Sequence, residues 1–235
     1  MSKWTEKTEY LVGSQGLEAY AAAHVLVVGV GGVGAFAAEF LARAGIGSLS
    51  LVDGDVVSAS NRNRQLLALC STEAQPKVEV LAARLLDINP DLKVTAHQLW
   101  LDTENIAPLL ESEAFDFVVD AIDDVPAKVA LLKTCLQKGI KVVSAMGAAG
   151  KYDPQQIQQA DISKSFHCGL AKAVRKRLAQ EGIKTGIPVV FSPEPTDLSH
   201  HPGNNGERVV PGTISYMPAS FACHLAAYVL KELSL

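Results

Sequence analysis

The sequence predicts an α/β protein with a doubly wound, mostly parallel Rossmann-like sheet and a smaller C-terminal α/β extension. Two observations support this fold class. Through the first two-thirds of the 235 residues, short apolar runs typical of buried strands alternate with helical patterns, which indicates repeated β-α-β units. A glycine-rich turn also follows the first apolar run and precedes a helical stretch, as in nucleotide-binding sheets.

The glycine-rich turn is the first feature of this predicted sheet. Residues 24–29 form a short apolar run that ends in glycine and predict a buried parallel strand, and residues 33–44 predict a helix. Glycine permits a tight turn and a close approach of the backbone to a phosphate, and a helix N-terminus offers unpaired N–H groups. The turn therefore predicts a nucleotide site. Its glycines are Gly29, Gly31, Gly32 and Gly34.

The remaining elements follow from the same patterns. We expect strands at residues 48–53, 93–100, 115–121 and 141–145, and helices at residues 75–88 and 126–138. Residues 1–150 then form the nucleotide-binding Rossmann-like part, and residues 151–235 extend the same domain. The extension is expected to contain a strand in 155–162, a basic helix at 169–181, a strand at 187–191, a long exposed loop at 193–212 and a final helix at 219–230.

Composition narrows the classes of function. The net charge of -4 argues against indiscriminate nucleic-acid binding, and a local basic face stays open as an alternative. The four cysteines include no Cys-x-x-Cys pair, so no zinc site is expected. The apolar stretch at residues 219–230 is shorter than the about 20 residues that a membrane span needs. The polar N-terminus does not resemble a signal peptide, so we expect a cytoplasmic protein.

A polar cluster surrounds the predicted nucleotide crevice. Asp53 ends the second strand and can accept hydrogen bonds from ribose hydroxyls. Arg64 and Lys77 place two cations beside the crevice, and Asp123 follows the fourth strand, where it can hold a Mg²⁺ ion that bridges phosphates. Two cations suit an attack on the α-phosphate of ATP, because they stabilise the charge that develops on the phosphoryl oxygens. The cluster also contains Asp55, Asn61 and Gln65.

Each of these residues also has a purely structural interpretation. Asp53 could cap a turn, and Arg64 and Lys77 could be solvated surface charges. Asp123 could stabilise the N-terminus of the helix that begins near Pro126 through the helix dipole. A dehydrogenase would instead need a catalytic His, Lys or Tyr beside a nicotinamide ring, and the histidines here have no such clear context.

The combination of motifs resembles the ThiF/MoeB/HesA group of ubiquitin-activating-like adenylating enzymes. The resemblance rests on the glycine turn, Asp53-Gly54-Asp55, Asn61-x-Asn63-Arg64-Gln65, Pro76-Lys77 and Asp120-Ala121-Ile122-Asp123. Within the group, the chain most resembles the tRNA threonylcarbamoyladenosine dehydratases, through segments such as Asp87-Ile88-Asn89-Pro90 and Ser192-Pro193-Glu194-Pro195. Such motifs are spread over essentially the whole chain.

The resemblance implies an ATP-dependent reaction on tRNA that carries threonylcarbamoyladenosine beside the anticodon. The threonyl carboxylate attacks the α-phosphate of ATP and releases pyrophosphate, and the carbamoyl group then closes onto the activated carbonyl and releases AMP. The family pattern implies catalysis by Arg64, Lys77 and Asp123, with Mg²⁺ on Asp123. The ATP contacts that it implies are Gly29, Gly31, Gly32, Gly34, Asp53, Asp55, Asn61, Arg64, Gln65 and Lys77.

The resemblance also implies partners. Dimers of the family place an N-terminal arginine in the ATP site of the partner, where this chain has Lys7, so we expect a homodimer with an N-terminal contact segment. The expected tRNA contact is the basic helix, with Lys172, Arg175, Lys176 and Arg177; a solvated helix face is the alternative.

Three other functions stay open at this point. One is an adenylyltransferase for a ubiquitin-like sulfur-carrier protein, although the zinc-binding cysteine pairs usual in such relatives are absent here. The second is an NAD-dependent oxidoreductase. The third is a nucleotide-binding scaffold that recruits a cysteine desulfurase or another sulfur-transfer partner.

Overall fold

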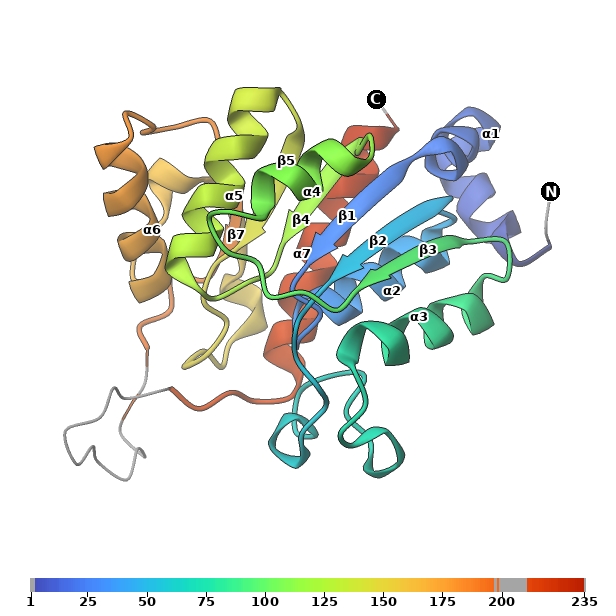
Figure 1. Ribbon diagram of the computed structural model, residues 1–235, viewed down its shortest axis with the longest axis horizontal. Coiled ribbons are helices and arrows are strands. Elements are labelled where there is room, and N and C mark those ends of the chain that lie inside the picture. Colours follow the sequence, from blue (N-terminus) through green and yellow to red (C-terminus); the bar gives the residue numbers. More distant parts are fainter. Residues whose placement is uncertain (1–2, 197, 199–210, 235) are drawn as a thin grey trace.

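The structure is a computed structural model that describes residues 3–196, 198 and 211–234. Seven strands of this part of the chain form one sheet in the order β3-β2-β1-β4-β5-β7-β6 (Figure 1). All neighbouring strands are parallel except β6 and β7, which are antiparallel. The strands are β1 (His24–Val28), β2 (Ser48–Val52), β3 (Lys93–His97), β4 (Phe117–Asp120), β5 (Lys141–Ala145), β6 (Gln158–Asp161) and β7 (Pro188–Phe191).

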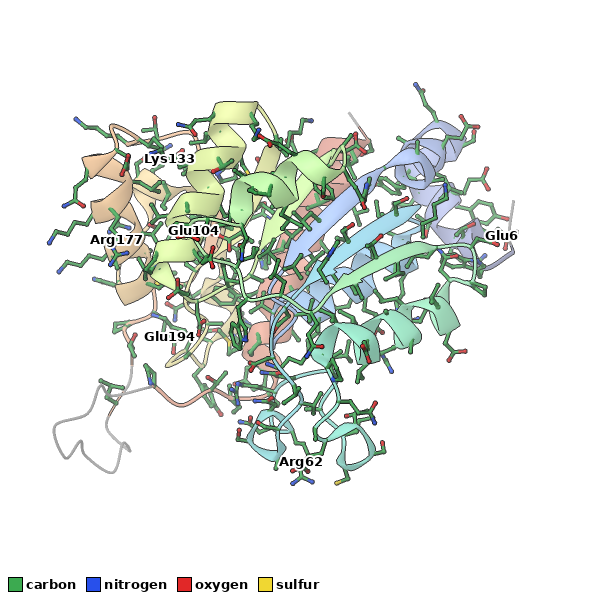
Figure 2. All side chains as sticks on the ribbon, viewed as in Figure 1. Glu6, Arg62, Glu104, Lys133, Arg177 and Glu194 are labelled. Carbon is green, nitrogen blue, oxygen red and sulfur yellow. The ribbon has the colours of Figure 1, made fainter. Side chains whose placement is uncertain are left out.

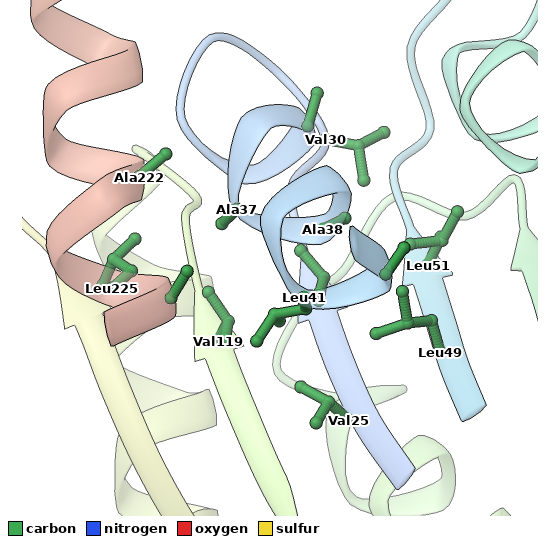
Figure 3. Close-up of a cluster of buried hydrophobic side chains, with 14 of the residues drawn as sticks. Val25, Val30, Ala37, Ala38, Leu41, Leu49, Leu51, Val119, Ala222 and Leu225 are labelled. Carbon is green, nitrogen blue, oxygen red and sulfur yellow. The ribbon is translucent and has the colours of Figure 1, made fainter. Parts of the chain in front are cut away.

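Helices cover both faces of the sheet, because successive residues of each buried strand point to opposite sides. In β1, Val25 and Val27 belong to one apolar cluster, and Leu26 belongs to another. The first cluster is completed by α2, α3 and α7, and Figure 3 shows Leu41 of α2 within it, near Val25 and Val119. The second is completed by α4, α5 and α6. The predicted doubly wound α/β class is therefore confirmed.

The helices alternate with the strands along most of the chain. They are α1 (Glu6–Ala22), α2 (Gly34–Ala44), α3 (Lys77–Ile88), α4 (Ile106–Ser112), α5 (Val125–Lys138), α6 (Gly169–Gln180) and α7 (Tyr216–Leu233). In the described part of the chain, no helix is both long and apolar enough to cross a lipid bilayer.

One polar contact joins α2 to α3 on the first face. The carboxylate of Glu39 is 9% exposed and accepts hydrogen bonds from Arg43 at 2.8 Å and from Arg84 at 2.6 Å. Burial acts to raise the pKa of Glu39, but the two arginines outweigh it and hold the pKa below its usual value.

Some boundaries differ from the sequence-based expectation. The strand predicted at residues 93–100 ends at His97, because His97 pairs with Val52, the last residue of β2, and the chain beyond has no strand to pair with. Helices α1 and α4 were not predicted, and α7 is longer than residues 219–230. The strand predicted in residues 155–162 is β6. Most of the loop predicted at residues 193–212 lies outside the described residues.

The residues after 150 continue the sheet of the first 150. Strand β7 pairs with β5, and β6 pairs with β7 at the edge. The last helix, α7, packs beside α2, so that the C-terminal part also contributes to the first apolar cluster. The connection from β3 through α4 to β4 crosses to the other side of β1 and reverses the direction in which strands are added, so the topological switch of the sheet lies between β1 and β4.

Candidate active site

A cleft of about 430 Å³ opens at the carboxyl ends of the strands β1, β2, β4 and β5. This is the edge at which open parallel sheets bind ligands, next to the topological switch. The cleft brings together residues that the sequence distributes over almost a hundred positions. The predicted residues that line it are Gly29, Gly31, Gly32, Asp53, Asp55, Asn61, Arg64, Gln65, Lys77 and Asp123.

Two predicted ATP contacts lie outside this lining. Gly34 is the first residue of α2, where a Cβ atom would come within 1.8 Å of the carbonyl oxygen of Gly29. Glycine is therefore needed there to pack the helix against the turn. Lys7 lies on α1, with its ammonium 4.8 Å from the centre of the Tyr10 ring. Its predicted contact is with a second subunit and stays a prediction.

The glycine turn is held open by Asp53. One carboxylate oxygen of Asp53 accepts the backbone N–H of Val30 at 2.8 Å, and the other accepts the N–H of Asp55 at 2.9 Å. Gly29 has a φ of 82°, and a Cβ atom there would lie 2.9 Å from the carbonyl oxygen of Ala121. A carboxylate has about four acceptor positions, so Asp53 retains capacity for ribose hydroxyls. The turn-capping interpretation of Asp53 thus holds, and its bond to Val30 extends this role to the glycine turn.

Lys77 lies at the start of α3 and is almost fully buried. Its ammonium forms an ion pair with Asp55 at 2.7 Å, and its side chain is 5% exposed against 48% for Asp55. The backbone N–H of Lys77 also donates to the carbonyl oxygen of Asp55 at 3.1 Å. Since Asp55 reaches solvent and Lys77 does not, the pair orients a desolvated ammonium at the wall of the cleft, where an anion would interact with it strongly.

The segment between β2 and α3 carries Arg64 and Gln65. One guanidinium nitrogen of Arg64 donates to the carbonyl oxygen of Ser60 at 3.0 Å and to the side chain of Asn63 at 2.8 Å. The side-chain oxygen of Asn61 accepts the N–H of Ser58 at 3.1 Å and so fixes the turn that precedes Arg64.

In the part of the chain that the structure describes, the side-chain amide of Gln65 has a free acceptor beside the glycine turn. Its side-chain oxygen is buried and has no hydrogen-bond partner within the described residues. Its side-chain nitrogen lies 3.7 Å from the position of a Cβ atom on Gly31, which places the amide beside the glycine turn. Buried acceptors are nearly always paired, so this oxygen fits a donor such as a nucleotide hydroxyl or amino group.

Asp123 lies in the turn between β4 and α5 and is exposed at the cleft. No grouping of three or more metal-binding side chains occurs among the residues that the structure describes. A single carboxylate with phosphate oxygens is, however, a common Mg²⁺ environment in nucleotide sites. Asp123 therefore fits an ion that is bound largely by phosphates.

Trp100 is a wall of the cleft that sequence analysis missed. Its ring is 66% exposed and lies over the backbone of Gly54, where a Cβ atom would come within 2.5 Å of the indole. Leu99 and Leu101 line the cleft beside it. The sequence pattern placed Trp100 inside a strand, and the useful signal would have been an aromatic residue just after the end of that strand.

The basic helix α6 lies beside the cleft, with Leu170 of its first turn in the lining. Lys172, Lys176 and Arg177 are exposed, and Figure 2 shows Arg177 on α6. Arg175 is different: it is half-buried and donates a hydrogen bond to the hydroxyl of Ser165. Three of the four predicted cations are therefore exposed, and Arg175 is engaged within the fold.

The fold and the cleft define a nucleotide-binding α/β protein with cations at the phosphate side. The sequence pattern of the ThiF family matches residues 6–235, and the chain belongs to this family. The resemblance drawn from the motifs is thus confirmed.

Matches to individual proteins are more specific than the match to the family. The chain is 40% identical to the tRNA threonylcarbamoyladenosine dehydratase of Bacillus subtilis, over 97% of this chain and 93% of the relative. It is 41% identical to the Escherichia coli enzyme of the same name, over 80% of this chain and 72% of the relative. The crystal structure of that E. coli dehydratase in complex with ATP matches with a TM-score of 0.89 and 36% identity, covering 98% of this chain and 93% of the other. The same enzyme is also known in complex with AMP, with a TM-score of 0.88.

Proposed function

We propose that this protein is an ATP-dependent dehydratase of threonylcarbamoyladenosine in tRNA. The observation that carries the proposal is the cleft at the strand ends, which joins a glycine turn to Arg64, Lys77 and Asp123. The relatives named dehydratases, one of them crystallised with ATP and with AMP, support the same reaction.

The reaction has two steps. A threonyl carboxylate oxygen attacks the α-phosphorus of ATP, and the bond to the β-phosphate oxygen breaks and releases pyrophosphate. The carbamoyl group then attacks the acyl carbon, and AMP leaves with the former carboxylate oxygen. The net loss from the nucleoside is one water. Ring closure is intramolecular, so that holding the two groups together supplies much of the rate without a protein nucleophile.

Each group that lines the cleft has its own role in the proposed reaction. The helix N-terminus and the glycine turn bind phosphates, and Arg64 and Lys77 stabilise the negative charge that grows on the α-phosphoryl oxygens. Asp53 binds the ribose with the acceptor capacity that Val30 and Asp55 leave free. Asp123 would hold Mg²⁺ together with phosphate oxygens. When bound, this ion would supply positive charge that stabilises the phosphates.

Three further features belong to the proposal. The exposed cations of α6 bind the tRNA backbone, because Lys172, Lys176 and Arg177 gather on one helix. The protein forms a homodimer through its N-terminal segment, where Tyr10 and Leu11 are 68% and 87% exposed, and Lys7 enters the ATP site of the partner. The protein acts in the cytoplasm, where a cysteine desulfurase or sulfur acceptor is a candidate partner.

Mass spectrometry tests the function directly. The protein is incubated with ATP, Mg²⁺ and tRNA that carries threonylcarbamoyladenosine, and the nucleosides are analysed with the AMP produced. We expect a nucleoside that is lighter by one water, in equal amount to AMP. AMP or an acyl-adenylate formed only when a ubiquitin-like protein is added would identify an adenylyltransferase instead. Tight binding of NAD without binding of ATP would overturn both.

A further inference from the structure

A fully buried ion pair lies behind the cleft. The ammonium of Lys128, in α5, is 2.9 Å from the carboxylate of Asp120, the last residue of β4, and both side chains are 0% exposed. Ser144 of β5 donates its hydroxyl to the same carboxylate at 2.6 Å. The site described above uses neither charge, although Asp120 is three residues from Asp123.

The pair is an expensive way to stabilise a core. Removing two charges from water costs several kcal/mol for each ion, and well-packed apolar residues often stabilise a protein as well as a buried pair does. Burial raises the pKa of Asp120, and the charge of Lys128 and the hydrogen bond from Ser144 oppose this change without cancelling it. We therefore expect the ion pair to have a role other than stabilising the fold.

A second contact of Lys128 indicates what this further contribution is. Its ammonium donates to the backbone carbonyl oxygen of Ile122 at 2.7 Å. The N–H of Ile122 donates to the carboxylate of Asp120 at 3.3 Å. Both backbone groups of Ile122 are thus held by the ion pair, and Ile122 is the residue directly before Asp123.

The other side of Asp123 is held as well. Asp124 is the N-cap of α5, where its carboxylate accepts the N–H of Ala127 at 2.9 Å and its carbonyl accepts the N–H of Lys128 at 3.0 Å. Asp123 therefore lies between two residues, Ile122 and Asp124, that are both held by hydrogen bonds. In the described part of the chain its own carboxylate makes no hydrogen bond or ion pair, so only the backbone restrains its position.

We propose that Lys128 is a positioning residue for adenylation, which holds the carbonyl of Ile122 and thereby fixes the carboxylate of Asp123 at the pyrophosphate side of the cleft. This inference rests on the function proposed above. A purely structural role would require only the charge balance between Lys128 and Asp120. The role proposed here requires the hydrogen bond from Lys128 to the carbonyl oxygen of Ile122.

Two variants separate the grip from the charge balance. Lys128→Met removes both and leaves Asp120 as an uncompensated buried charge, so its thermal stability falls. In Asp120→Asn/Lys128→Met the charges are gone together, and the Asn oxygen still accepts the N–H of Ile122. We expect the double variant to recover most of the melting temperature and none of the lost kcat. Lys133→Met is the matched control: it removes a lysine from the same helix, paired with Glu181 outside the cleft.

The expected loss for both Lys128 variants is roughly tenfold to a hundredfold in the kcat of AMP formation, as when a catalytic group is displaced by about 1 Å. A double-mutant cycle with Asp123→Asn then tests the route. If Lys128 acts through Asp123, Lys128→Met causes no further loss of kcat in the Asp123→Asn background. Losses that multiply, or full activity in the charge-balanced double variant, would overturn the proposal.

A binding measurement keeps the inference independent of turnover. Calorimetry gives the ATP affinity of each variant with and without Mg²⁺. We expect Asp120→Asn/Lys128→Met to keep its affinity for metal-free ATP and to lose the gain that Mg²⁺ adds in the wild type. An unchanged Mg²⁺ gain would refute the role of Lys128 even if the tRNA assay succeeds. A wild type that binds ATP but does not act on tRNA would instead refute the proposed function alone.

Discussion

Arg64 offers the sharpest test of the catalytic cleft. Replacing it by alanine removes a guanidinium that lines the cleft and that donates to the Ser60 carbonyl and the Asn63 side chain. These two contacts are near the surface, and each is worth about 0.5–1.5 kcal/mol of net stability. A loss of 1 kcal/mol lowers the melting temperature of a protein of this size by roughly 2–4 °C. The variant should therefore remain folded.

The effect on catalysis is expected to be far larger. Removing one donor from a developing oxyanion typically costs about 2.7–4 kcal/mol in the transition state, which is a loss of about a hundredfold to a thousandfold in kcat. Arg64→Ala should accordingly almost abolish AMP formation. Arg64→Lys keeps the charge without the planar fork and should recover only part of the activity.

The neighbouring Arg62 is the control. It is exposed in the same segment, appears at the tip of the loop in Figure 2, and contacts the sulfur of Cys70 at 2.7 Å instead of lining the cleft. AMP release and thermal melting are measured for both variants. Arg62→Ala should keep normal turnover. If Arg64→Ala turned over at the same rate as Arg62→Ala, Arg64 would have no role at the phosphates.

Three other predictions concern binding, stability and reactivity. ATP should change the tryptophan fluorescence of a Trp4→Phe variant as much as that of the wild type, and Trp100→Phe should abolish the change, because only Trp100 of the two lines the cleft. Since the pKa of Glu39 is lowered in the folded state, its ion pairs stabilise the fold above the unfolded pKa of about 4.3 and lose this effect as the pH falls further. Glu39→Gln should therefore lower the melting temperature at neutral pH, with a difference from the wild type that shrinks in acid; a difference independent of pH would contradict the ion-pair account. Iodoacetamide should modify the exposed Cys70 in the native protein and leave Cys135 intact, since burial and then the charge of Asp120 raise the pKa of Cys135 to about 12; peptide mass analysis distinguishes the two.

The order of elements was predictable because its signals are local. The apolar run before Gly29 and the glycines after it specify a strand, a turn and a helix within about twenty residues of sequence. The meeting of Asp53 and Asp123 at one cleft was also predictable, because parallel strands share a carboxyl edge. Helix α1 was missed because most of its surface is exposed and Gly13, with a φ of 75°, interrupts it, which weakens any periodic apolar pattern.

The contacts inside the site could not be predicted in the same way. A lysine in an apolar helical stretch gives no sign that Lys128 reaches the end of β4, because that contact depends on how α5 packs on the sheet. Trp100 likewise gains its place only where β3 ends against β2. The positions of Lys128 and Trp100 depend on how distant segments of the chain pack together, and residue type alone does not determine them.

The bond from Asp53 to Val30 has a consequence for how a nucleotide arrives. Asp53 follows β2 directly and holds the backbone of the glycine turn through this bond, so contacts within the fold set the shape of the turn. The turn loses its conformational entropy when the chain folds, so ATP binding does not include this cost. We therefore expect nucleotide association at this turn to need no rearrangement of its backbone.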